Sequence, residues 1–173
     1  NLGNTLGNFG TNNFTLEVWA KIPDVIGSRE QVIMSIRNEC TGNTFWNLLI
    51  EETGKVQFEA NGTNSGYFNS TTIQGGFDDN HWHHYAWVRN GLNHKLYVDG
   101  ILLLDINTSV LSNYTNTANL HLGKNDCSDI NETWAASYLK GNLDEFRLWN
   151  VARTQNEIQI NMSVEISNQM NLT

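Results

Sequence analysis

The sequence contains few residues that kink a chain, cross-link it or give it positive charge. It contains one proline and two cysteines among 173 residues, and ten basic side chains against eighteen acidic ones. An acidic chain without a Lys/Arg cluster argues against nucleic acid or an anionic membrane as a partner. No apolar run reaches the roughly eighteen residues of a membrane span. The composition therefore predicts one globular domain, of net charge −8, with a sizeable core.

The sequence also lacks a starting methionine and a signal peptide, so we expect a mature or excised part of a larger, multidomain protein. Scarce Lys, abundant Asn and Thr, and two Cys favour an extracellular or cell-surface location. Eight triplets fit the N-glycosylation pattern, although a chain this rich in Asn, Ser and Thr also produces them by chance. They begin at Asn13, Asn61, Asn69, Asn107, Asn113, Asn131, Asn161 and Asn171.

Helical periodicity is missing from most of the chain. Short runs of alternating apolar residues are separated by turns, which predicts an all-β sandwich or barrel. The expected strands are Phe14–Ile22, Gln31–Ile36, Phe45–Glu51, Lys55–Ala60, His83–Arg89, Lys95–Val98, Ile101–Asp105, Ala118–Gly123 and Leu143–Trp149, with an edge strand around Leu2–Leu6 and a short strand inside the polar stretch Asn61–Gly76. Near the end, Thr154 and Glu157 fit a capping box, so we expect one short helix there.

The segment from Phe77 to Asp105 predicts a three-stranded meander. It holds Asn90-Gly91 and Asp99-Gly100 between apolar runs, and such dipeptides readily take the positive backbone angles of tight hairpin turns. We expect its large side chains to pack in the core, namely Trp82, Tyr85, Trp87 and Leu96.

Three segments, in this order, resemble a laminin G-like domain of the concanavalin A-like jelly-roll superfamily. They are FTLEVWAKI at residues 14–22, HWHHYAWV followed by KLYVDG at residues 81–100, and GNLDEFRLWNVART at residues 141–154. The resemblance implies a two-sheet antiparallel jelly-roll sandwich over residues 1–155, with residues 156–173 as its helix and tail. In that family the loops at one rim often bind glycans or calcium.

Histidines and carboxylates raise two other interpretations. His83 and His84 are adjacent on a strand and point to opposite faces, so packing is favoured over a metal site. Glu17, Asp144 and Glu145 suggest a glycoside hydrolase, but the Glu-x-Asp-x-x-Glu arrangement of jelly-roll glycosidases is missing. An ion pair of Arg147 with Glu145 or Glu17 is the more economical interpretation.

Two further features depend on the resemblance. By position in the family, Asn64 and Asn116 are the nearest matches to its calcium ligands, and Asp126 supplies charge from a neighbouring loop. Asn in place of Asp at residue 64 weakens a site for a hard cation. If Cys40 and Cys127 share one rim, a disulfide between them stabilises the fold by about 4 kcal/mol. Two free thiols in a reducing compartment are the alternative.

Exposed aromatic residues beside amides and carboxylates are typical of a glycan platform. Trp46 lies on a strand and is expected in the core. The predicted binding loops are Arg37–Thr44, Asn61–Tyr67 and Lys124–Trp134, with Arg37, Tyr67, Asn125, Asp126 and above all Trp134 as ligand contacts. The alternative for Trp134 is a lid over the core beneath its long loop. The sequence thus predicts a non-catalytic module that binds a glycan or an extracellular protein, with calcium as an accessory ion. A structural spacer or dimerisation domain is the alternative.

Overall fold

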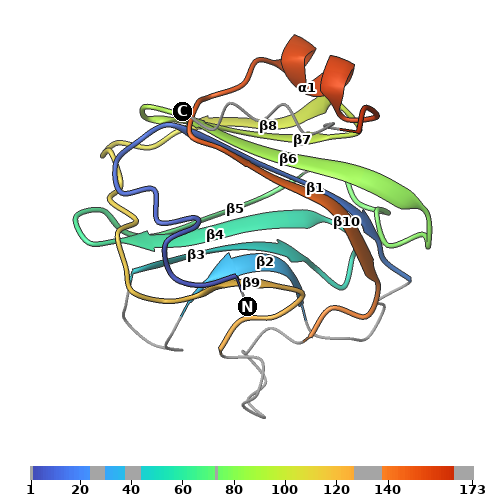
Figure 1. Ribbon diagram of the computed structural model, residues 1–173, viewed down its shortest axis with the longest axis horizontal. Coiled ribbons are helices and arrows are strands. Elements are labelled where there is room, and N and C mark those ends of the chain that lie inside the picture. The colour runs from blue at the N-terminus through green and yellow to red at the C-terminus, as the bar shows by residue number, and fades with distance from the viewer. Residues whose placement is uncertain (1, 24–29, 38–43, 73, 127–137, 166–173) are drawn as a thin grey trace.

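A computed structural model describes residues 2–23, 30–37, 44–72, 74–126 and 138–165 (Figure 1). Within these ranges the chain forms ten strands and one helix, α1 (Gln155–Asn161). The first sheet has the order β10 (Asn142–Trp149), β1 (Phe14–Lys21), β6 (Trp82–Asn90), β7 (Asn93–Val98) and β8 (Ile101–Asn107). The second has the order β5 (Gly66–Thr71), β4 (Val56–Gly62), β3 (Phe45–Ile50), β2 (Gln31–Ile36) and β9 (Leu120–Leu122). Every pair is antiparallel, which confirms the predicted sandwich.

The core lies between the two sheets and follows the predicted alternation. Phe14, Leu16 and Val18 of β1 are fully buried, because residues two apart on a strand share a face. Trp46 of β3 meets Trp87 of β6 across the sandwich, with ring centroids 5.8 Å apart. Trp46 is therefore a core residue, as expected.

The β6–β7–β8 meander is present, with one correction to its turns. Asp99 and Gly100 have φ of 52° and 73°, the positive values of a type I′ hairpin turn. The first turn instead consists of Gly91 and Leu92, since Asn90 pairs with Asn93 inside the ladder. Gly91 alone has a positive φ, 61°, and glycine at the first central position suits a type II′ turn.

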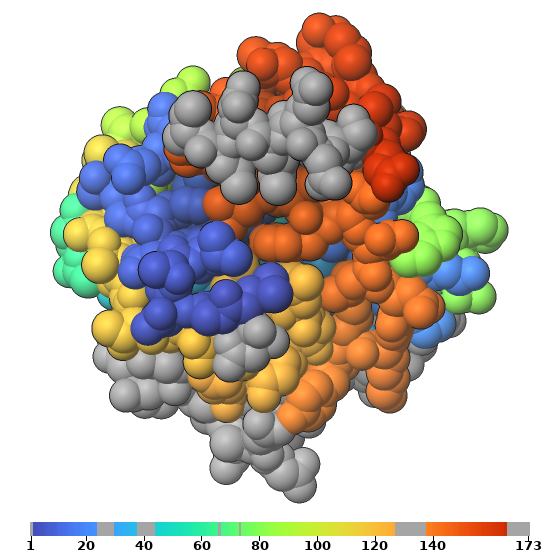
Figure 2. Space-filling view, in the orientation of Figure 1, coloured from blue at the N-terminus to red at the C-terminus, as the bar shows by residue number. Residues whose placement is uncertain are grey.

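The N-terminal segment is not the predicted edge strand around Leu2–Leu6. It crosses one face of the molecule beside the chain around Leu120 (Figure 2), and the Leu2 N–H donates to the Leu120 carbonyl at 2.9 Å. Gly7 has a φ of 76° and approaches Ile36 too closely for a side chain. Its carbonyl accepts the indole N–H of Trp46 at 3.1 Å. Glycines that bend the backbone thus replace regular strand pairing here.

A buried arginine fastens this segment to the sandwich. Arg89 is fully buried, and its guanidinium donates to the carbonyls of Asn12 (2.9 Å), Gly10 (2.9 Å) and Ser112 (2.8 Å). Burial lowers the pKa of Arg89. Because a buried cation needs acceptors, these three carbonyls fix the loops that supply them.

Helix α1 covers the outer face of the first sheet (Figure 1). Its capping box is formed as predicted, with the Thr154 side chain accepting from the Glu157 N–H and the Glu157 side chain accepting from the Thr154 N–H. Ile158 is fully buried and packs with Ala86 and Val88 of β6. In the described ranges no helix is long and apolar enough to span a membrane.

Candidate functional site

Two of the predicted ligand residues meet on the outer face of the second sheet. Tyr67 points outward from β5 and is 60% exposed, whereas the neighbouring Phe68 packs against the core. Arg37 follows the end of β2, and its guanidinium carbon lies 3.9 Å from the ring centroid of Phe45. The rings of Phe45 and Tyr67 have centroids 6.5 Å apart. Phe45 therefore joins Arg37 and Tyr67 into one cluster, the Tyr67 platform.

A carboxylate and two amides complete the polar part of the platform. The Arg37 guanidinium lies 3.3 Å from Glu59 Oε1, and the Asn47 amide donates to Glu59 Oε2 at 3.1 Å. Asn69, exposed on β5, donates to the Tyr67 hydroxyl at 3.2 Å. An exposed ring with polar groups fixed around it can stack on a sugar and bond its hydroxyls.

The surroundings of the platform are acidic. The pKa of the Tyr67 phenol is raised, first by partial burial and then by the charge of Glu59. The pKa of Glu30 is also raised, by burial and then by the charges of Glu59, Glu51 and Glu52. The charges of four carboxylates therefore influence one another near this face, and the Arg37 guanidinium contacts one of them, that of Glu59.

Further polar contacts extend along the same face. The Glu51 carboxylate accepts from the Thr71 hydroxyl at 2.9 Å and from the Gln57 amide at 3.2 Å. Thr71, Gln57 and Tyr67 all lie on the outer face, because β4 and β5 alternate inward and outward. The hydrogen-bonding surface therefore spans two strands.

Four of the platform's residues were missed in the sequence, and two of them, Phe45 and Glu59, contact Arg37 directly. Phe45 begins β3 on the side opposite to Trp46, which points into the core, and it is only 4% exposed, since Arg37 packs on its ring. Glu59 points outward between the core residues Phe58 and Ala60. Strand alternation alone could have placed both outside, but their meeting with Arg37 depends on how three strands pair.

The predicted calcium ligands engage three different sets of partners. Asn64 Oδ1 accepts the Asn113 N–H at 2.9 Å. Asn116 Oδ1 accepts the Ala118 N–H at 2.7 Å. Asp126 lies 3.3 Å from His121 Nε2. In the described part of the chain no three His, Cys, Asp or Glu residues are grouped to hold a metal. These partners account for the side chains without an ion, and the calcium site stays a prediction.

The remaining predicted contacts lie in or beside the loop after β9. Asn125 is buried and Asp126 is partly exposed. Trp134, Cys40 and Cys127 lie outside the described residues, as does most of the loop Arg37–Thr44. The disulfide and the role of Trp134 therefore remain predictions.

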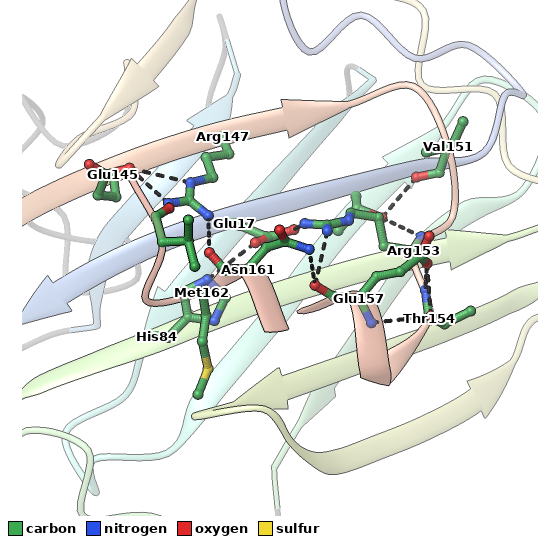
Figure 3. A network of polar contacts seen from close by, with 12 residues as sticks. Glu17, His84, Glu145, Arg147, Val151, Arg153, Thr154, Glu157, Asn161 and Met162 are labelled. Atoms are coloured by element: carbon green, nitrogen blue, oxygen red, sulfur yellow. Dashed lines mark hydrogen bonds and ion pairs between the residues drawn. The ribbon is translucent and has the colours of Figure 1, made fainter. Parts of the chain in front are cut away.

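The opposite face of the sandwich holds a buried ion network under α1 (Figure 3). Glu17 of β1 is fully buried, its Oε1 accepts from Arg153 at 2.7 Å, and its Oε2 lies 3.3 Å from His84 Nε2. Burial alone would raise the pKa of Glu17, but hydrogen bonds from His84 and Arg153, together with their charges, lower it. The buried Glu17 carboxylate therefore links the segment that contains α1 to the sheet, and a substrate cannot reach it.

A second ion pair extends this network. Arg147 Nη2 lies 2.9 Å from Glu145 Oε2. This is one of the two ion pairs predicted for Arg147. The same guanidinium donates to the carbonyls of Asn161 and Val164, each at 2.6 Å. Glu145 has a φ of 49° and lies where the register between β1 and β10 shifts, as in a β-bulge that re-aims a side chain.

A hollow of about 420 Å³ lies beside this pair. Its lining includes Trp19, Trp82, Glu145 and Arg147. Trp82 is 43% exposed, so its predicted packing in the core was wrong. It starts β6 on the outward side, the same side as the buried His84. The Trp19 indole N–H donates to the Met162 carbonyl at 2.7 Å. The polar groups of this hollow donate hydrogen bonds to the backbone of the segment after α1. Because these groups are already engaged, we favour the Tyr67 platform as the binding face.

The comparisons with known proteins agree with this architecture. Residues 2–159 match the laminin G-type model of the concanavalin A-like lectin/glucanases superfamily, and the chain belongs to that superfamily. No curated protein sequence matches the chain.

Several solved structures share the fold at low sequence identity. The CBM40 of the Ruminococcus gnavus IT-sialidase, bound to α2,3-sialyllactose, is 16% identical with a TM-score of 0.67, over 86% of this chain and 82% of that one. Domain 4 of an extracellular arabinanase from Geobacillus stearothermophilus, in complex with arabinotriose, is 16% identical with a TM-score of 0.68, over 92% and 69%. The receptor-binding domain of botulinum neurotoxin D is 20% identical with a TM-score of 0.66, over 91% of this chain but 38% of that one.

Proposed function

We propose that this chain is a non-catalytic carbohydrate-recognition module, and that it binds glycans on the Tyr67 platform. The observation that carries the proposal is the meeting of Tyr67, Phe45 and Arg37 on one outward face, with Glu59 fixed at 3.3 Å from Arg37. A sugar ring needs an apolar surface for its C–H face and fixed polar groups for its hydroxyls. The platform provides both.

The structural neighbours support the same class of function. A sialidase module bound to sialyllactose and an arabinanase domain bound to arabinotriose use this fold. Both come from proteins that act on carbohydrates, and both were solved with an oligosaccharide bound. An extracellular or surface location, within a larger protein, fits this role and the composition of the chain.

Calcium is a secondary proposal and stands apart from the platform. The side-chain oxygens of Asn64, Asn116 and Asp126 would be its ligands, and they now contact the Asn113 N–H, the Ala118 N–H and His121. Melting the protein with calcium and with a chelator tests it, because a ligand that binds only the native state raises the midpoint.

An array of oligosaccharides, followed by calorimetry with the best binder, tests the proposed function. Tyr67→Ala should weaken binding at least about tenfold, or about 1.4 kcal/mol, and leave the melting temperature nearly unchanged. Ile101→Ala is the matched control, because Ile101 is also 60% exposed but lies in the first sheet. Unchanged binding by Tyr67→Ala would reject the platform. A blank array would favour a protein ligand, a spacer or a dimerisation domain.

A further inference from the structure

The charges around the Tyr67 platform bear on which glycans it accepts. Sugars that carry a carboxylate, such as sialic and uronic acids, require a cation or a set of free donors at the site. Neutral sugars require only hydroxyl partners and an apolar surface. The question is therefore whether the platform has a positive charge available to a ligand.

Arg37 is the cation of the platform, and it is already engaged. Its guanidinium lies between the Phe45 ring at 3.9 Å and the Glu59 carboxylate at 3.3 Å. The side chains of Arg37 and Glu59 are only 12% and 14% exposed. An incoming carboxylate would have to compete with Glu59 for the same guanidinium, in a position where the competing charge is partly shielded from water.

Among the described residues, several carboxylates add negative charge near the platform. Burial raises the pKa of Glu30, and the charges of Glu59, Glu51 and Glu52 raise it further. Partial burial raises the pKa of Tyr67, and the charges of Glu59 and Glu30 raise it further, whereas the charge of Arg37 lowers it. Glu59 pairs with Asn69, two residues from Tyr67 on β5, so a ligand carboxylate at Tyr67 would meet a like charge that salt only partly screens.

We infer that the Tyr67 platform selects neutral glycans and discriminates against glycans that carry a carboxylate at the bound sugar. The inference rests on the proposed function and names its ligand class. Glu59 is the residue that sets this selectivity, because it neutralises Arg37. The carboxylates then accept hydrogen bonds from the hydroxyls of a neutral sugar, a role that needs no positive charge.

Matched pairs on a glycan array test the inference. Each pair consists of a neutral oligosaccharide, for example lactose, and the same oligosaccharide extended by a sialic or uronic acid. The neutral member should bind at least about tenfold more tightly, and the ratio should shrink in about 0.5 M salt because salt screens the repulsion. Equal or tighter binding of the acidic member would overturn the inference and leave the proposed function standing. Binding to neither member would overturn the proposed function itself.

A single substitution separates charge from shape. Glu59→Gln keeps the size of the side chain and frees Arg37, so the preference for the neutral member should fall at least about threefold. Asp105→Asn is the control, because it removes the same charge from β8 in the other sheet and should leave the ratio unchanged. Melting curves of both variants verify folding. A ratio that Glu59→Gln leaves unchanged, in a folded protein, would show that Glu59 does not set the selectivity.

Discussion

The guanidinium of Arg37 lies 3.3 Å from the carboxylate of Glu59, and this contact joins the end of β2 to β4 on the face that carries Tyr67. The two residues are 22 positions apart in the chain. Their pairing holds one side of the platform in place and also cancels its positive charge. The same contact therefore contributes to both the rigidity and the selectivity of the proposed site.

The Arg37–Glu59 pair should show measurable coupling. Arg37→Met leaves the Glu59 carboxylate without this cation in a position only 14% exposed, so we expect a loss of about 1 to 2 kcal/mol of unfolding free energy. Glu59→Gln and the double variant complete a mutant cycle, with a coupling of about 1 kcal/mol expected from urea denaturation. Strictly additive effects would show that the contact is not formed in solution.

Substitution of the buried carboxylate of Glu17 should lower the unfolding free energy far more than substitution of an exposed carboxylate. Glu17→Gln leaves Arg153 and His84 without their anion under α1, so we expect a loss of about 3 to 5 kcal/mol. Glu145→Gln is the control, because the Glu145 side chain is 39% exposed and its substitution should cost less than about 1 kcal/mol. Similar losses in the two variants would contradict the sealed network. Chemical denaturation supplies both values.

Stability should fall with acid in two overlapping windows. Burial, and next the charge of Arg89, lower the pKa of His94 from 6.5 to about 4. The unfolded chain therefore binds this proton first, so stability is complete above pH 6.5 and falls by up to about 3 kcal/mol toward pH 4. The lowered pKa of Glu17 adds a loss that begins near its ordinary value of 4.5 and continues as the pH falls through the folded-state pKa.

NMR titration of the histidine rings checks the first window directly. Trp87 donates its indole N–H to His94 Nδ1 at 3.3 Å, which requires the neutral ring. His94 should titrate near pH 4, well below a solvent-exposed histidine. A His94 ring that titrates near 6.5 would show that the ring is not buried as described.

Substitution of Arg89 should destabilise the protein. Arg89→Met removes the hydrogen bonds to three carbonyls, those of Gly10, Asn12 and Ser112, so we expect a loss of about 3 kcal/mol and faster hydrogen exchange in those loops. Arg89→Lys keeps the charge but has no planar fork, so it should restore only part of the loss. Full recovery by lysine would show that charge alone matters here.

Much of the fold was predictable because alternation and turn chemistry are local. Phe14, Leu16 and Val18 reveal the inward face of β1 without any knowledge of their partners. Asp99-Gly100 likewise specifies a turn by its own backbone preference. The strand predicted around Leu2–Leu6 was wrong because glycines with positive φ, rather than side-chain pattern, shape that segment.

The platform was only partly predictable because it is assembled across strands. Arg37 and Tyr67 were identified as separate loop residues, and the structure brings them together through Phe45. The pairing of β3 with β4 places Asn47 opposite Glu59, a relationship of register that no single stretch encodes. Trp82 was misplaced because it shares the outward face of β6 with His84, whereas Tyr85 and Trp87 point into the core.

The most direct test of the account is to map the glycan on the protein. Amide spectra of the labelled chain would be recorded while the neutral oligosaccharide selected by the array is added. We predict shift changes that cluster at Phe45, Glu59, Tyr67 and Asn69 on the outer face of the second sheet. Shift changes that cluster at Trp19, Trp82 and Arg147 on the first sheet, with none at the Tyr67 platform, would contradict the proposed site.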